Sequence, residues 1–411
     1  MATIRIQNFG PIKDSGIVEL TTILLIIGRQ SAGKSTFMKV LSYCRWLEKK
    51  VMTSFEQVVS VYTHNERFKR DLMLFHRIND IYFHDDTKIE YDGDVLSIVF
   101  PGDGQNAKII RKEGKWENRY NSKITYIPAE RNLVSAVKNI DVDYKAKERD
   151  VLFNFILEWA EAKEKFTHQR PMRLSVTDDF RYYSEDGKDY IQLPDGRSMT
   201  AFFASSGIQS VMPLDVMANY IIDLVGQTVR FSKQDLLNKL MEMLDAEDGS
   251  KIDLSAFSEG KVSTMRTRMK YQSAQLFVEE PEQNLYPDAQ KQLVLNLVRS
   301  IKKAQAKGEQ HSSLVMTTHS PYILSVINVL IAEAGAVEKR PDDARIKALV
   351  DDDTLLQLSE YSAYHIDKNG VFQSIKEADI PMFSGVELDE VSDWVNEKID
   401  KLNLVLYGDA E

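Results

Sequence analysis

Continuous apolar runs and segments of helical spacing alternate along most of the chain. Residues 23–27 form an unbroken apolar run that ends at Gly28, and further strand patterns occur at 123–128, 274–278 and 313–318. An unbroken run is typical of a strand buried on both faces, as in a parallel sheet. The segments with helical spacing are 36–47, 207–225, 287–306 and 320–334. This order of elements predicts an α/β protein in which helices flank a sheet.

Other segments show shorter or weaker patterns. Residues 2–7 alternate between apolar and polar side chains before the turn signal at 9–11, which predicts an edge strand. Segments 81–117 and 173–203 contain several short strand patterns separated by glycine-containing turns, the first of them at 81–83. The remaining segments are predicted as helices at 53–78, 142–168, 234–246 and 386–402, a strand pair at 361–375, and a polar loop or lid at 247–263. In the helix at 142–168 the expected packing stripe is Val151, Phe153, Ile156, Leu157 and Trp159.

Composition excludes several classes of protein. The chain has 411 residues, with 52 Lys and Arg against 62 Asp and Glu, a net charge of −10, and one cysteine, Cys44. A single cysteine excludes an intramolecular disulfide and a cysteine-based zinc cage. The acidic balance argues against a protein that coats nucleic acid, because generic phosphate binding needs a basic surface. The first residues lack the apolar stretch of a secretory leader, so we expect a cytoplasmic protein without membrane contact.

One glycine-rich segment carries the pattern of a phosphate-binding loop. It consists of Gly28, Arg29, Gln30, Ser31, Ala32, Gly33, Lys34, Ser35 and Thr36, between a predicted buried strand and a predicted helix. The two glycines let backbone N–H groups point inward around a phosphate, and the helix N-terminus adds a favourable field. Lys34 is expected to reach the β- and γ-phosphates of a nucleotide, and the Ser35 hydroxyl to hold Mg²⁺. The alternative interpretation is an ordinary glycine-rich turn.

Two acidic residues end the strand pattern at 274–278. Because side chains alternate along a strand, Glu279 and Glu280 are expected to point in different directions. Glu279 is predicted to hold Mg²⁺ through water, and Glu280 to orient or deprotonate an attacking water. His319 follows the carboxyl end of the strand pattern at 313–318, and we expect this histidine to contact the γ-phosphate. Solvated acids at an exposed strand end and a structural histidine are the alternatives.

Further motifs occur in an order that is specific to one superfamily. Residues 203–210 are similar to a signature motif, with Ser205, Ser206, Gly207 and Gln209 at the matching positions. Three other segments match the same group of proteins: 4–10, 126–131 and 281–287. Together with the phosphate loop and the strand-end acids, these motifs resemble the ABC-type ATPases, in particular the soluble RecF/SMC/OLD-like branch with its prokaryotic defence-associated members. A serine N-cap of the following helix is the other interpretation of the signature segment, and both can hold together.

The resemblance implies a P-loop NTPase core of α/β class, with a mixed sheet flanked by helices, an antiparallel β subdomain and helical insertions. Segments 81–117 and 173–203 would supply the antiparallel subsheet. We expect a core over 1–335 and a C-terminal strand pair and helix over 336–411. The insertions are expected at 51–120, 136–170 and 226–270. No transmembrane, coiled-coil hinge or Toprim segment is expected, and the acidic run 351–353 is interpreted as an exposed loop instead of a metal cluster.

The resemblance also implies a mechanism. One protomer would hold ATP and Mg²⁺ while Ser206 and Gly207 of a second copy cap the γ-phosphate, so that ATP closes a homodimer and hydrolysis reopens it. Because no nuclease domain is recognised, we expect the ATPase to regulate a separately encoded effector, such as a nuclease or toxin, in bacterial anti-phage defence. Two alternatives stay open: a RecF-like ATPase acting on DNA ends, and a scaffold that keeps ATP bound with little turnover. The charge does not indicate nucleic-acid binding, although a groove formed in the dimer would permit it.

Overall fold

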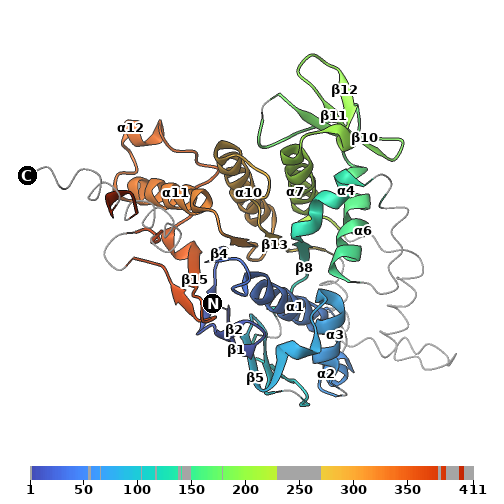
Figure 1. Cartoon of the computed structure of the whole chain (residues 1–411), viewed down its shortest axis with the longest axis vertical. Helices are drawn as coiled ribbons and strands as arrows, with labels where there is room; N and C mark the ends of the chain where they lie inside the picture. The colour runs from blue at the N-terminus through green and yellow to red at the C-terminus, as the bar shows by residue number, and fades with distance from the viewer. Residues whose placement is uncertain are drawn as a thin grey trace, which may run out of the picture.

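A central mixed sheet organises the molecule. In spatial order its strands are β16 (Phe372–Ser374), β15 (Tyr361–Ile366), β4 (Ile23–Gly28), β14 (Ser313–Thr318), β13 (Ser273–Glu279) and β8 (Ser122–Ile127) (Figure 1). Neighbouring strands are parallel except β15 and β16, which are antiparallel. The computed structural model describes residues 2–53, 57–64, 66–102, 104–115, 118–137, 140, 150–177, 179–228, 270–377, 381–385 and 398–401. The predicted α/β fold with a mixed sheet is confirmed, and the strands after residue 335 extend this sheet at β4.

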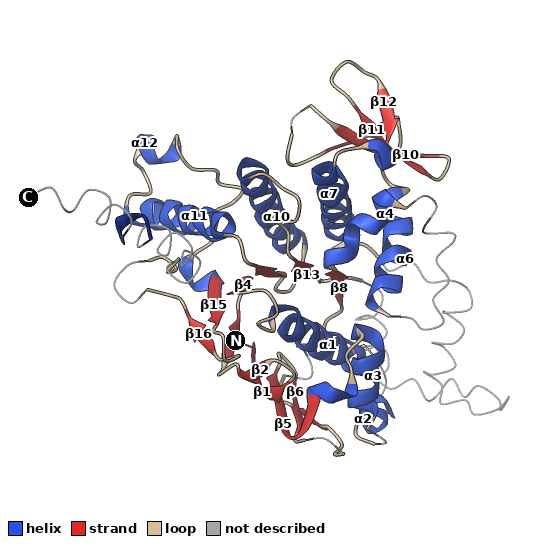
Figure 2. Cartoon of the chain, viewed as in Figure 1, coloured by secondary structure: helices blue, strands red, loops and turns tan. Residues whose placement is uncertain are grey.

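Helices cover both faces of the central sheet (Figure 2). The helix α1 (Lys34–Met52) packs on one face. The other face carries α6 (Val151–Lys163), α7 (Ser206–Leu224), α10 (Pro287–Lys307) and α11 (Pro321–Lys339). Other short helices are η1 (Asp80–Tyr82), η3 (Ala129–Asn132), α4 (Leu133–Ala136), η4 (Ala201–Phe203), α12 (Ala344–Lys347) and η6 (Leu358–Glu360).

The strand β4 shows why its sequence is apolar at every position before the glycine. Ile23 and Leu25 belong to the core beneath α7, α10 and α11, whereas Leu24 and Ile26 belong to the core around α1. All six residues of the strand are buried. Each such side chain contributes about 1.5–3 kcal/mol by leaving water, so a polar residue would be costly on either face.

A second sheet is antiparallel and packs against α1. Its strands are β2 (Ile12–Asp14), β1 (Ala2–Phe9), β5 (Phe83–Asp92), β6 (Leu96–Phe100) and β7 (Lys108–Arg111), with β3 (Val18–Leu20) also paired to β1. The prediction that residues 2–7 form an edge strand is wrong. The chain turns back once after residue 9, so β2 and β3 follow one another along one side of β1, and β5 pairs with its other side.

A third sheet lies at the far end of α6 and α7 (Figure 1). It consists of β9 (Met172–Arg173), β10 (Arg181–Glu185), β11 (Lys188–Gln192) and β12 (Ser198–Thr200), all antiparallel. The expectation that segments 81–117 and 173–203 share one subsheet is therefore wrong. The first segment pairs with β1, whereas the second packs on α6 through Tyr182, whose ring lies 5.9 Å from that of Trp159.

Several predicted helices are shorter than expected or divided. The segment 53–78 contains two helices, α2 (Gln57–Tyr62) and α3 (Arg67–His76), and the strand expected at 81–83 is replaced by the turn of η1. In α6 the buried face contains Leu152 and Phe155, so Phe153 and Leu157 do not belong to the packing stripe, and Leu157 is exposed. Three predicted segments lie wholly or mostly outside the described residues: 234–246, 247–263 and 386–402.

The helix α11 is long and apolar enough to cross a membrane, with a mean hydropathy of 1.4. Its buried residues, which include Ile323, Ile327 and Ile331, recur at a spacing of about one turn and belong to the core shared with α10. This spacing is the pattern of a helix that packs on the core with one face, and 33% of its apolar window is buried. In the acidic run after it, Asp351 forms an ion pair of 2.6 Å with Arg299, and no group of three potential metal ligands occurs in the described part of the chain.

Candidate functional site

The carboxyl ends of three neighbouring strands meet at one edge of the central sheet. Thr318 of β14 pairs with Ile27 of β4, and Thr317 of β14 pairs with Glu279 of β13. The segments that follow these strands therefore start side by side. Ligands bind at this edge of open α/β sheets.

The loop after β4 has the backbone shape that its glycines permit. The φ angles of Gly28 and Gly33 are 158° and 109°. A Cβ atom at Gly28 would lie 3.0 Å from the carbonyl oxygen of Ile366, and one at Gly33 would lie 3.0 Å from Cγ1 of Ile12. Both positions combine an unusual backbone angle with close packing, so glycine is required there.

Lys34 is held inside this loop. Its Nζ donates hydrogen bonds to the carbonyl oxygens of Gly28 and Arg29, each at 2.9 Å, and the residue is 5% exposed. Burial lowers the pKa of Lys34 from its ordinary value, and the nearby carboxylates of Glu280 and Glu282 oppose that shift. A buried ammonium bonded only to neutral carbonyls gains more from an anionic phosphate, because charge-assisted hydrogen bonds are stronger.

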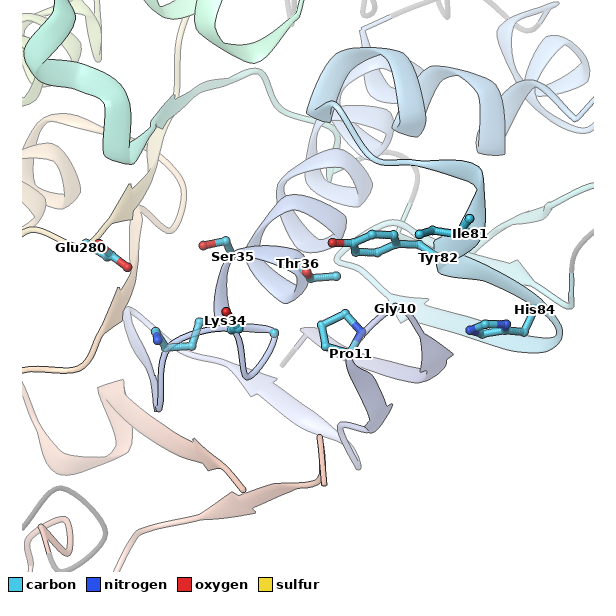
Figure 3. Close-up of a pocket in the computed structure, with 11 residues that line it drawn as sticks. Gly10, Pro11, Lys34, Ser35, Thr36, Ile81, Tyr82, His84 and Glu280 are labelled. Atoms are coloured by element: carbon cyan, nitrogen blue, oxygen red, sulfur yellow. The ribbon is translucent and has the colours of Figure 1, made fainter. Parts of the chain in front are cut away.

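A cavity of about 480 Å³ opens beside Lys34 (Figure 3). Its lining residues are Ser31, Gly33, Lys34, Ser35, Thr36 and Glu280 at the loop, and Gly10, Pro11, Ile81, Tyr82 and His84 from the second sheet and η1. This volume lies within the usual range for small-molecule sites. One end is polar and charged, and the other end presents the Tyr82 ring.

Gly10 makes room for the Tyr82 ring. A Cβ atom at Gly10 would lie 2.2 Å from Cδ1 of Tyr82, and the Gly10 N–H donates to the Tyr82 carbonyl oxygen at 2.9 Å. Figure 3 shows the ring extending along the cavity toward Ser35 and Thr36. An aromatic ring next to a phosphate loop can hold a flat base.

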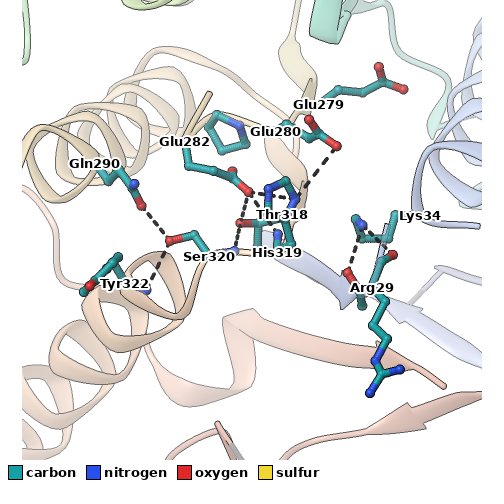
Figure 4. A network of polar contacts seen from close by, with 12 residues as sticks. Arg29, Lys34, Glu279, Glu280, Glu282, Gln290, Thr318, His319, Ser320 and Tyr322 are labelled. Carbon is teal, nitrogen blue, oxygen red and sulfur yellow. Dashed lines mark hydrogen bonds and ion pairs between the residues drawn. The ribbon is translucent and has the colours of Figure 1, made fainter. Parts of the chain in front are cut away.

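Glu280 reaches the same cavity from the end of β13. Its φ angle is 42°, a left-handed conformation that costs a residue with a side chain about 1–2 kcal/mol. Its carboxylate faces Lys34 across the cavity and has an oxygen 3.9 Å from Nδ1 of His319 (Figure 4). Such strained residues concentrate at functional sites. The predicted divergence of the two acids is observed, because the Glu279 carboxylate bonds Tyr126 and Ala129 whereas the Glu280 carboxylate lines the cavity.

Glu279 is buried and both of its carboxylate oxygens accept hydrogen bonds from the protein. The Tyr126 hydroxyl donates at 2.5 Å and the Ala129 N–H at 3.0 Å. Burial and the charge of Glu279 raise the pKa of Tyr126 well above its ordinary value, so the phenol remains a donor. Because Glu279 does not line the cavity, a contact between Glu279 and a metal in the cavity would run through water.

The oxygen ligands that Mg²⁺ prefers are present at the cavity. The Ser35 hydroxyl and the Glu280 carboxylate line it together with Lys34. Nearby, Oε2 of Glu282 is buried without a hydrogen-bond partner among the described residues, but Glu282 does not line the cavity. This donor set fits a magnesium nucleotide, with Ser35 as the direct ligand.

Glu282 organises the segment that carries His319 (Figure 4). Its Oε1 accepts hydrogen bonds from the Thr318 hydroxyl at 2.7 Å and from the His319 N–H at 2.9 Å, and lies 3.5 Å from Nδ1 of His319. Next along the chain, the Ser320 hydroxyl donates to Gln290 at 2.6 Å and caps α11. The His319 ring, 52% exposed, is thereby held at the rim of the site.

The signature-like segment lies at the N-terminus of α7 and outside the cavity described above. Ser205 is the N-cap, Ser206 is exposed, and Gly207 is half-buried. The Gln209 side chain donates to the carbonyl oxygens of Ala201 and Phe202, at 3.1 and 3.0 Å, and so fixes the preceding turn. The N-cap interpretation is confirmed, because the Ser205 side chain accepts a hydrogen bond from the Ile208 N–H.

One protein-family model matches residues 23–325, and it is described as "AAA domain, putative AbiEii toxin, Type IV TA system". The chain belongs to this family. The match to the AbiEii-type AAA family spans the phosphate loop, the signature-like segment, Glu279 and His319. Together with the mixed sheet, the match fits the P-loop ATPase core that the sequence resemblance predicted.

Solved structures similar to this AbiEii-type AAA protein are heads of SMC proteins. The SMC head domain from Thermotoga maritima has 9% identity and a TM-score of 0.39, over 92% of this chain and 98% of that one. The Smc head with an extended coiled coil bound to the C-terminal domain of ScpA, derived from Pyrococcus furiosus, has 8% identity and a TM-score of 0.36, over 97% and 99%. At these scores the likeness carries no further conclusion. A comparison with curated proteins gave no match.

The tertiary structure adds residues to the site that sequence reasoning missed. The sequence could have indicated Glu282, because it follows Glu279 and Glu280 within one acidic run. Arg131 had a weaker signal, as the last residue of the segment 126–131. Tyr82 had none, since it reaches the cavity only through η1 and its packing on Gly10.

Proposed function

We propose that this AbiEii-type AAA protein binds ATP with Mg²⁺ in the cavity beside Lys34 and hydrolyses it with Glu280. The observation that carries the proposal is the convergence of Lys34, Ser35 and Glu280 on one cavity from two strands that are far apart in the sequence. Lys34 and the loop N–H groups bind the phosphates, and the Tyr82 end accepts the base. Mg²⁺, held by Ser35 and through water by Glu279, would neutralise charge on the β- and γ-phosphates.

Glu280 is suited to act on the attacking water. Its side chain is 29% exposed at the cavity, so it reaches solvent while its backbone is held by a hydrogen bond of 3.0 Å from its N–H to the Thr317 carbonyl oxygen. A carboxylate in this position accepts a proton or orients the water for in-line attack. His319, held through Glu282, is proposed to contact the γ-phosphate.

The protein is proposed to close as a homodimer on ATP. The signature-like segment does not line the cavity of its own chain among the described residues, which supports a role in the cavity of a second copy. Exposed aromatic side chains surround it: Phe203 is 70% exposed and Tyr286 is 80% exposed. The two come from adjoining segments, since Gly207 packs against Asn284. Exposed apolar groups beside a functional segment are typical of an interface.

We further propose that this cycle regulates a separately encoded effector, such as a nuclease or toxin, in the cytoplasm of a bacterium under phage attack. The family description names a toxin of a type IV toxin–antitoxin system, which supports a partner encoded nearby. The net charge of −10 favours a protein partner over DNA.

The decisive experiment compares steady-state ATP turnover, nucleotide affinity and mass in solution for the wild type, Glu280→Gln and Lys34→Ala. We expect Glu280→Gln to bind ATP, to lose turnover by about 10²–10⁴-fold and to accumulate ATP-dependent dimers. Lys34→Ala should lose nucleotide binding. The matched control is Lys50→Ala, an exposed lysine at the other end of α1, which should behave as wild type.

The outcomes separate the alternatives. Normal turnover in Glu280→Gln would contradict the assignment of Glu280. ATP-dependent dimers of the wild type without turnover would identify a scaffold. Binding of DNA ends that weakens steeply with salt would identify a RecF-like role.

A further inference from the structure

Arg131 is a fully buried arginine whose guanidinium contacts the backbone on both sides of the site. It is 0% exposed. It donates to the carbonyl oxygens of Ser210 at 3.1 Å, Glu279 at 2.7 Å, Glu280 at 2.8 Å and Pro281 at 3.5 Å. Burial lowers the pKa of Arg131 to about 10, so the group stays charged at neutral pH.

Three of these acceptors are successive carbonyls around the strained residue. The φ angle of Glu280 is 42°, and the carbonyls of Glu279 and Pro281 flank it. The planar fork of an arginine matches several acceptors in fixed directions, which a lysine cannot do. Arg131 therefore holds the backbone conformation that aims the Glu280 carboxylate at the cavity.

The fourth acceptor belongs to α7, the helix that begins with the signature-like segment. Ser210 lies in the second turn of α7, and its hydroxyl oxygen accepts a second hydrogen bond, from Nδ2 of Asn284 at 2.9 Å. Asn284 has a φ angle of 61°, and a Cβ atom at Gly207 would lie 3.1 Å from its carbonyl oxygen. The start of α7 and the loop after β13 thus form one tightly packed junction.

We propose that Arg131 is a positioning residue, which sets the orientation of the Glu280 carboxylate through the backbone of residues 279–281 and ties it to α7. This inference rests on the proposed function. In the proposed dimer, α7 of one protomer faces the nucleotide of its partner, whereas Glu280 acts on the nucleotide of its own protomer. Arg131 then joins the two nucleotide sites, because a shift of α7 by the partner's nucleotide moves the residues that hold Glu280.

The test measures kcat and KM for ATP turnover in Arg131→Lys, together with nucleotide affinity and melting temperature. A misplacement of the carboxylate by about 1 Å should lower kcat by roughly 10- to 100-fold with KM and nucleotide affinity within about twofold. The matched control is Arg45→Lys, a second buried arginine, which forms an ion pair of 2.7 Å with Asp94, and neither residue lines the cavity. This control should lower the melting temperature without lowering kcat.

A second variant leaves the buried charge intact. Asn284→Gly tolerates the positive φ angle and removes only the amide that bonds Ser210. We expect a fall in kcat of at least about threefold without a change in KM. Unchanged kcat in folded Arg131→Lys and in Asn284→Gly overturns the inference, and so does an equal fall of kcat in Arg45→Lys. A wild type without turnover instead contradicts the proposed function.

Discussion

The backbone N–H of His319 donates to the buried Oε1 of Glu282 at 2.9 Å, so the third carboxylate of the acidic run supports the segment after β14. The Thr318 hydroxyl uses the same oxygen at 2.7 Å. The two strands that end at the site are therefore joined by one side chain. The negative charge of Glu282 also opposes the burial that lowers the pKa of Lys34 and of Arg131.

We expect Glu282→Ala to destabilise the fold by about 1–3 kcal/mol, because it leaves two buried donors without acceptors. Turnover should fall too, since His319 loses its support. Glu282→Gln keeps an oxygen at the same place and is the matched control. Chemical denaturation and ATP turnover measure the two effects. If both variants kept the stability of the wild type, the bridging role of Glu282 would be wrong.

Tyr82 is predicted to hold the base of the nucleotide. Tyr82→Ala should weaken nucleotide binding by about 1–3 kcal/mol, the usual worth of stacking on an aromatic ring. Tyr82→Phe retains the ring and should bind nearly as the wild type does. Titration with a fluorescent ATP analogue measures both affinities. Equal affinity of all three proteins would place the base elsewhere.

The exposed aromatic side chains near the signature-like segment are predicted to lie in the dimer interface. Phe203→Glu and Tyr286→Arg should prevent ATP-dependent dimers in the Glu280→Gln background, because a buried unpaired charge is costly. Nucleotide binding by the monomer should be retained. Leu74→Glu is the matched control, since Leu74 is 47% exposed on α3, away from this surface. Light scattering with and without ATP measures the mass of each variant in solution. Dimers that form as readily as in the Glu280→Gln protein would refute the placement of Phe203 and Tyr286 in the interface.

Asp215 on α7 is predicted to make stability depend on pH. Burial raises the pKa of Asp215 from 3.8 to about 6, although its oxygens accept hydrogen bonds from the Ser175 N–H and from Asn296. The unfolded state ionises first as the pH rises, so stability should fall between about pH 4 and 6, by roughly 3 kcal/mol, and then level off.

Asp215→Asn should remove this part of the pH dependence and raise the melting temperature at pH 7. This requires the side-chain amide of Asn296 to flip, so that it pairs with the new amide. Melting temperatures of both proteins at intervals between pH 4 and 7 measure the pH dependence of stability. A slope in this window that is the same for the variant and the wild type would exclude Asp215 as its source.

Much of the fold follows from local pattern. The apolar run at 23–27, the strand at 274–278 and the helices after them occur where the pattern predicts them, because strands buried on both faces are mostly apolar, although Gln275 interrupts the second one. The strands of residues 2–7 and 173–203 were assigned correctly, but their partners were not. The alternation of apolar and polar residues indicates which face of a strand is buried, but it does not indicate which strand pairs with it.

The sequence by itself determined the phosphate loop, the two acids at the end of β13, His319 and the signature-like segment, because each depends on residue types at short spacing. Only the tertiary structure decided that Tyr82 shares a cavity with Lys34, that Glu279 is turned toward Tyr126, and that Arg131 joins Glu280 to α7. These relationships depend on which strands pair and which helices pack across the sheet. Contacts between residues that are far apart in the chain are set by the burial of whole faces, and no local pattern specifies them.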